Sequence, residues 1–181
     1  MIPTFQFNLG TGDGGVGMHS TGTVLEYLIS RDIKAPREAV FRAWIVPKVV
    51  SEWWGPHDFI IPTCEIDARP GGQYRIVMRS PENLDRVLSG AFLEVEDSRQ
   101  LMMTVIETGI HPSWLDPRSQ HHPLTQETAP AAWIQTITFN AHPEGTRLTI
   151  QILFPSPESH GAFIRLRMDE GWQESLDSLT A

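Results

Sequence analysis

Cysteine is almost absent from this sequence, since Cys64 is the only one among 181 residues. A single cysteine excludes an intrachain disulfide and a metal site built from several thiolates, and it fits a reducing compartment. Cys64 lies in the apolar stretch IPTCEIDA. This setting favours a small buried hydrophobe over a nucleophile, because a reactive thiolate needs a partly exposed, electropositive site.

Positive charge is also scarce. Lysine and arginine total 14 against 22 aspartates and glutamates, which gives a net charge of −8. Such a chain repels phosphate backbones unless a local basic patch compensates. Arg69, Arg75 and Arg79 do lie close together, but they alternate with apolar residues as the exposed face of a strand does. We therefore expect no nucleic-acid partner.

Long apolar runs are missing as well, because none approaches the roughly 18 residues that a membrane span needs. The first residues, MIPTFQFNLGTGDGG, contain neither a basic segment nor a continuous apolar segment of the kind found in secretion signals. The expectation is a cytoplasmic protein with no membrane partner.

Glycine, in contrast, is concentrated near the start. Residues 10–22, GTGDGGVGMHSTG, hold six glycines and almost nothing that can pack. Gly10, Gly12 and Gly15 match the spacing of a dinucleotide loop, but no helix follows and no βαβ pattern occurs in the chain. The prediction is a flexible glycine-rich arm at residues 1–22, followed by a single domain at 23–181.

The remaining pattern predicts an α+β domain. Residues 24–33 are typical of a strand, and Pro36 and Pro47 each begin a short helix. Alternating apolar residues then predict six more strands arranged as antiparallel hairpins, with turns such as Arg69-Pro70-Gly71-Gly72. Near the end, one long amphipathic helix is predicted from apolar residues at helical spacing: Ile164, Met168, Trp172, Leu176 and Leu179.

A proline-rich connection without periodicity spans residues 109–131. Loops longer than about 12 to 15 residues are usually functional or disordered. Trp114 is too apolar for a solvated linker, which suggests a lid that folds back onto the domain. Metal-ligating side chains also gather here, but adjacent histidines rarely share one ion and no helical zinc spacing is present, so we expect no metal site. These side chains are His111, Asp116, His121, His122 and Glu127.

Several segments together resemble a known family. They are APREAVFRAWIVPKVVSEWWGP, EIDARPGGQYRIVM, SGAFLEVEDSRQLMMT, ITFNAHPEGTRLTI and MDEGWQESLDSL. In this order they are similar, from about residue 28 to 179, to the activator of heat-shock-protein-90 ATPase homologue family of the START-like (SRPBCC) superfamily. The resemblance implies a helix-grip fold, in which a curved antiparallel sheet of about seven strands wraps a long C-terminal helix, with two short helices after the first strand. It also implies an apolar cavity between sheet and helix.

The predicted cavity residues are mostly aromatic or methionine side chains on the elements that would face it. An aromatic and methionine stripe is more often plain core than pocket, so the alternative is that these side chains fill the space themselves. The predicted residues are Trp53, Trp54, Phe59, Tyr74, Ile76, Met78, Phe92, Trp114, Met168 and Trp172.

The resemblance implies binding of a hydrophobic small molecule, lipid-like or polyketide-like, because relatives hold such molecules in this cavity; no cofactor is expected. A protein-interaction module related to chaperone ATPase activators is the second hypothesis, although those activators carry a separate N-terminal domain that 22 flexible residues cannot replace. A cyclase-like or hydrolase-like enzyme is the third, because His57, Tyr74 or a glutamate in an apolar cavity could acquire a shifted pKa. No catalytic residue is assigned. Exposed strand edges leave a homodimer as an open expectation.

Overall fold

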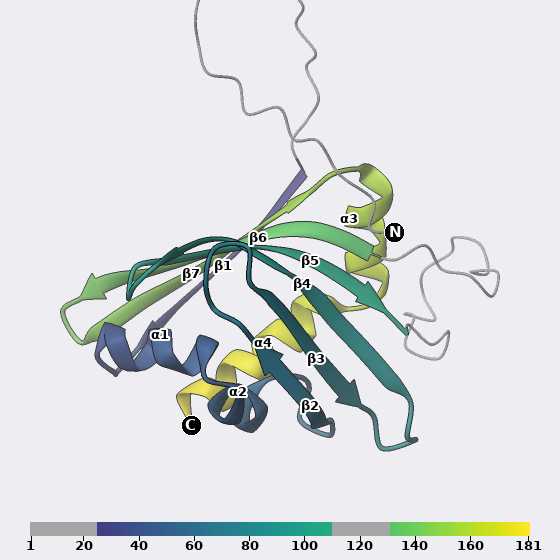
Figure 1. Cartoon of the computed structure of the whole chain (residues 1–181), viewed down its shortest axis with the longest axis horizontal. Helices are drawn as coiled ribbons and strands as arrows, with labels where there is room; N and C mark the ends of the chain where they lie inside the picture. The colour runs from purple at the N-terminus through teal and green to yellow at the C-terminus, as the bar shows by residue number, and fades with distance from the viewer. Residues whose placement is uncertain (1–24, 110–130) are drawn as a thin grey trace, which may run out of the picture.

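One antiparallel sheet of seven strands forms the frame of the protein, with the strand order β1-β7-β6-β5-β4-β3-β2 (Figure 1). The computed structural model describes residues 25–109 and 131–181. The strands are β1 (Leu25–Ile33), β2 (Ile60–Ile66), β3 (Gln73–Arg79), β4 (Asp85–Glu96), β5 (Gln100–Thr108), β6 (Ala131–His142) and β7 (Gly145–Phe154).

Two short helices, α1 (Arg37–Ile45) and α2 (Pro47–Trp53), follow the first strand as predicted. Pro47 is the first residue of α2, where proline is favoured because it lacks the backbone N–H that a first helical turn leaves unpaired. Pro36 is the N-cap of α1, one residue before the first helical position, which the sequence suggested it would occupy. The two helices bury five large apolar side chains, namely Val40, Phe41, Trp44, Val50 and Trp53. The α+β helix-grip class is therefore confirmed.

The C-terminal helical region is divided, where the sequence predicted one unbroken helix. It consists of α3 (Pro157–Arg165) and α4 (Met168–Thr180), separated at Arg167, whose φ of 51° is left-handed. Phe163 and Trp172 are nine residues apart, which at about 3.6 residues per turn would place them on opposite sides of a continuous helix. The break lets both side chains be buried, and it leaves Ile164 48% exposed instead of facing the sheet.

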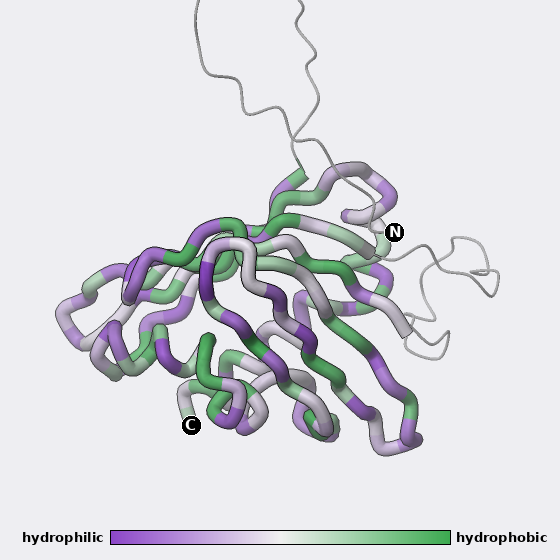
Figure 2. The backbone as a smooth tube through the Cα atoms, viewed as in Figure 1, coloured by the Kyte–Doolittle hydropathy of each residue, from purple (hydrophilic) through white to green (hydrophobic). Residues whose placement is uncertain are grey.

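The concave face of the sheet arches over α4, and α2 packs beside that helix (Figure 1). Hydrophobic and hydrophilic residues alternate along the strands, as expected for a sheet with one buried face (Figure 2). Leu101, Ile137, Leu148, Ile150 and Ile152 form the most buried part of this face, with at most 1% exposure. In the described residues, no helix is long and apolar enough to cross a membrane.

Glycine permits close contact where β4 pairs with β5. A Cβ atom on Gly90 would lie 1.9 Å from the carbonyl oxygen of Thr104, so only glycine fits there. The hydroxyl of Tyr74 donates a 2.8 Å hydrogen bond to the same oxygen, and Ala91 N donates to Thr104 Oγ1 at 3.0 Å. These contacts fix the inward faces of β3, β4 and β5 relative to one another.

Candidate ligand pocket

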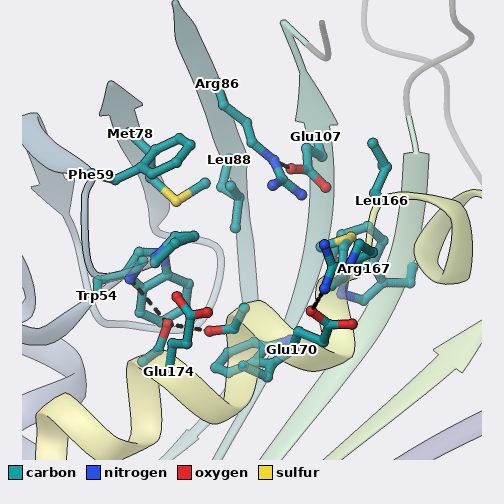
Figure 3. A pocket seen from close by; sticks show the side chains of 17 residues that line it. Trp54, Phe59, Met78, Arg86, Leu88, Glu107, Leu166, Arg167, Glu170 and Glu174 are labelled. Carbon is teal, nitrogen blue, oxygen red and sulfur yellow. Dashed lines mark hydrogen bonds and ion pairs between the residues drawn. The ribbon is translucent and has the colours of Figure 1, made fainter. Parts of the chain in front are cut away.

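A pocket of about 470 Å³ lies between the concave face of the sheet and α4 (Figure 3). Its walls come from the α2–β2 connection, from β3 to β6 and from both sides of the α3–α4 break. The lining residues are Trp54, Gly55, Pro56, Phe59, Met78, Arg86, Leu88, Glu107, Trp133, Leu166, Arg167, Met168, Glu170, Gly171, Trp172, Glu174 and Ser175.

Tryptophans form the end of the pocket near α2. The Trp54 and Trp172 rings meet edge to face with centroids 5.2 Å apart, and Trp172 stacks on Trp44 at 5.9 Å. Trp53 stands behind them, 5.2 Å from Trp54, and donates a 2.9 Å hydrogen bond to the Ala43 carbonyl. Edge-to-face and stacked contacts are the arrangements that aromatic rings prefer, so these indoles pack together as one apolar wall.

The Gly55-Pro56 turn is attached directly to α4. Gly55 has a φ of 95°, which side chains other than glycine rarely adopt. Its N–H donates to Ser175 Oγ at 3.1 Å, and that hydroxyl donates to the Gly171 carbonyl at 2.8 Å. His57 N also donates to Glu174 Oε2 at 3.2 Å. The Gly55-Pro56 turn is therefore held against α4 by hydrogen bonds, and it forms one wall of the pocket.

Two charged side chains are buried within this largely apolar pocket. Strand register places Met78 opposite Arg86 and Leu88 opposite Glu107, so all four occupy neighbouring positions of the sheet. Arg86 is 8% exposed and Glu107 is 0% exposed, and Arg86 Nε donates a hydrogen bond to Glu107 Oε1. Burial lowers the pKa of Arg86 to about 10, so the guanidinium remains charged at neutral pH.

The rim near the α3–α4 break carries further charge. Arg167 forms an ion pair with Glu170, and Glu174 lies farther along α4 (Figure 3). With Arg86 and Glu107 included, the lining holds two arginines and three glutamates. The pocket is therefore an apolar space with a slight excess of negative charge.

A second, much smaller void of about 20 Å³ lies deeper under the sheet. Tyr74, Ile76 and Phe92 line this void and do not line the larger pocket. A volume of this size holds about one water molecule. These three side chains therefore act as core in this structure.

The ten residues predicted from the sequence divide accordingly. Trp54, Phe59, Met78, Met168 and Trp172 line the larger pocket. Trp53 is 4% exposed and belongs to the core behind Trp54. Trp114 lies outside the described residues, as do the arm at 1–22, most of the predicted lid at 109–131 and the side chains His111, Asp116, His121, His122 and Glu127.

Sequence reasoning missed Arg86 and Glu107, although a signal was present. Arg86 is two residues before Leu88, and Glu107 is two residues after Val105, so strand alternation assigns both to the apolar face. Trp133 and Leu166 were also not predicted to line the pocket.

Other reactive groups in the described residues lack an obvious chemical role. Burial raises the pKa of the Cys64 thiol, which keeps it protonated at neutral pH, and Cys64 is half-buried on the edge strand β2. Burial also raises the pKa of the Tyr74 phenol well above its usual range. Residues 25–109 and 131–181 contain no group of three or more side chains able to hold a metal ion.

The arched sheet, the helix across its concave face and the two short helices after β1 define a helix-grip, START-like protein. A family model described as Activator of Hsp90 ATPase homolog 1-like protein matches residues 34–181, so the chain belongs to that family. A search of curated proteins gave no match.

Solved structures with the same fold come from several bacteria. A protein from Nitrosomonas europaea is 26% identical with a TM-score of 0.68, over 86% of this chain and 92% of that one. A protein from Rhodobacter sphaeroides is 19% identical with a TM-score of 0.70, over 86% and 89%. The AHSA1 protein from Silicibacter pomeroyi is 21% identical with a TM-score of 0.63, over 86% and 95%.

Proposed function

We propose that this protein binds a hydrophobic small molecule in the pocket between the sheet and α4. The observation that carries the proposal is a space of about 470 Å³ lined by Trp54, Phe59, Met78 and Trp172. Sites for small organic ligands commonly have volumes of about 300 to 1,000 Å³, with apolar walls and a few polar groups. Filling the pocket would remove apolar surface from water, which favours binding of an apolar guest.

Supporting evidence also comes from the distribution of exposed apolar residues. The large hydrophobic side chains exposed in the described residues are Leu28, Ile60, Leu93 and Ile164. They lie on β1, β2, β4 and α3, and β1 and β2 are opposite edges of the sheet. A protein-docking surface needs a contiguous apolar patch. Scattered residues favour ligand binding over the protein-interaction hypothesis.

Native mass spectrometry of the purified protein is the first test, because a retained ligand adds mass to the folded chain. Titration with fatty acids, flavonoids and polyketide-like aromatics should then change tryptophan emission, since Trp54 and Trp172 line the pocket. Trp172→Phe should lose much of this response. Trp53→Phe is the matched control, because Trp53 is buried outside the pocket lining.

The proposal fails if none of these three ligand classes binds. A response that persists equally in Trp172→Phe and disappears in Trp53→Phe would place the ligand elsewhere. An emission change caused only by a protein partner would favour the interaction module.

A further inference from the structure

Within residues 25–109 and 131–181, the side chains of Arg86 and Glu107 have no hydrogen-bond partner besides each other. In the described part of the chain, the Arg86 side chain donates a single hydrogen bond, from Nε, although a guanidinium offers five N–H donors. Glu107 Oε2 is buried and finds no hydrogen-bond partner among the described residues. Burying charged groups with unused hydrogen-bonding capacity costs free energy, and replacing such a pair by apolar residues is often neutral or stabilising.

The pair stands at the wall of the space that a ligand would occupy, with Glu107 Oε2 closed off from water in the empty pocket. Both residues line the pocket, and the guanidinium end of Arg86 extends from β4 into it beside Glu107 (Figure 3). Leu88 and Met78, their neighbours on the sheet, present apolar surface to the same space. The pocket thus has a buried polar end among apolar walls, in addition to the charged rim near the α3–α4 break.

We propose that the Arg86–Glu107 pair is the polar end of the ligand site and selects an uncharged molecule with an apolar body and one group that both accepts and donates a hydrogen bond. An alcohol, a phenol or a primary amide has this chemistry. Its oxygen accepts from a terminal nitrogen of Arg86, and its O–H or N–H donates to Glu107 Oε2. This inference rests on the proposed function and adds the chemical class of the ligand.

Charge argues against an anionic ligand. The guanidinium of Arg86 is already neutralised by Glu107, and the lining as a whole has three glutamates against two arginines. A carboxylate entering this space would lose its hydration without gaining a free cation. An uncharged head group avoids that desolvation penalty.

Three probes of similar shape test the proposal by titration calorimetry at pH 7: naphthalene, 2-naphthol and 2-naphthoate. The first has no polar group, the second an uncharged hydroxyl and the third a carboxylate. We expect 2-naphthol to bind about tenfold more tightly than naphthalene, as one or two buried hydrogen bonds provide, and more tightly than 2-naphthoate.

A double variant removes the polar end while limiting damage to the fold. In Arg86→Met/Glu107→Leu, both charges are replaced together, so neither is left unpaired. The ratio of 2-naphthol to naphthalene affinity should fall to about one, within the error of the measurement. Arg79→Met/Asp85→Leu is the matched control, because it removes a partly exposed ion pair between β3 and β4 outside the pocket lining. Its affinity ratio should equal that of the wild type.

The outcomes separate this inference from the proposed function. If the wild type binds naphthalene and 2-naphthol equally well, the polar end is refuted while the pocket still binds ligands. Preference for 2-naphthoate would refute selection of an uncharged group. If no probe binds, the proposed function itself is contradicted. The wild-type ratio decides the question even if the double variant does not fold.

Discussion

At the scale of single residues, burial alone does not distinguish a core side chain from a ligand contact. Met78 and Met103 are 4% and 6% exposed, yet Met78 lines the large pocket and Met103 lines only the small void. Both belong to the hydrophobic core cluster. The two methionines are similarly buried but only Met78 lines the large pocket, so Met103 serves as the control for Met78.

Replacement of Met78 should therefore weaken ligand binding more than replacement of Met103. Each alanine variant should lose about 2 to 5 kcal/mol of stability, because each removes a buried side chain. Only Met78→Ala should also reduce affinity for an apolar ligand, by about fivefold to tenfold, since it alone removes contact area in the pocket. Titration of both folded variants checks this, and equal losses of affinity would leave pocket and core indistinguishable.

Tyr74 contributes a pH dependence through its buried phenol. Burial raises the pKa of Tyr74 in the folded state, whereas the unfolded value is about 10. The unfolded chain therefore releases this proton at a lower pH than the folded chain does. Stability from the uncharged phenol is complete below about pH 10 and decreases as the pH rises above that value.

Tyr74→Phe should be about 1 kcal/mol less stable than wild type at pH 7, because the hydrogen bond to Thr104 is lost. Above about pH 10, wild type should lose stability faster, by up to about 1.4 kcal/mol per pH unit, so that the two curves converge. Chemical denaturation between pH 8 and 11 measures both slopes. Parallel slopes would show that Tyr74 ionises equally easily in the folded and unfolded states.

At the scale of elements, most strands and both short helices could be predicted because each had a clear local pattern. Alternation identified β3 through Tyr74, Ile76 and Met78, and prolines identified the starts of α1 and α2. The α3–α4 break could not be predicted in this way. Arg167 adopts a left-handed conformation that normally favours glycine, so its residue type gives no sign of the break. The break is explained instead by tertiary packing, because it allows both Phe163 and Trp172 to be buried.

The helix α4 offers a variant that separates stability from binding. Gly171 lines the pocket, and an added Cβ would meet only Pro56 Cγ, at 3.9 Å, which is an ordinary contact. Gly171→Leu should raise stability by about 0.5 to 1 kcal/mol, because glycine disfavours helix, while its side chain occupies the pocket and reduces ligand affinity at least about tenfold.

Gly161→Leu is the control for that experiment. Gly161 lies in α3 outside the pocket lining, and its added Cβ would meet the flexible end of Arg165 at 3.0 Å. It should gain similar helix propensity without loss of affinity. Thermal unfolding and ligand titration of both variants provide the comparison, and unchanged binding by a folded Gly171→Leu variant would contradict the assigned ligand position.

At the scale of the whole molecule, the sequence predicted the helix grip but only part of its site. Trp54, Phe59, Met78, Met168 and Trp172 were recognisable because large apolar side chains occupied elements expected to face one another. Alternation places Arg86 and Glu107 on the apolar face, but their pairing could not be predicted, because it depends on the β4–β5 register, which joins residues 21 positions apart. Long-range register of this kind is specified by the assembled sheet and not by a local motif.

An apolar guest should occupy the space between the sheet and α4. Methionine-methyl NMR during a naphthalene titration tests it most directly, because Met78 and Met168 line the pocket from opposite sides. Met102, on β5 and outside the lining, is an internal control. The Met78 and Met168 signals should shift together with saturation while the Met102 signal stays in place. Unchanged Met78 and Met168 signals, or an equal shift of Met102, would contradict it.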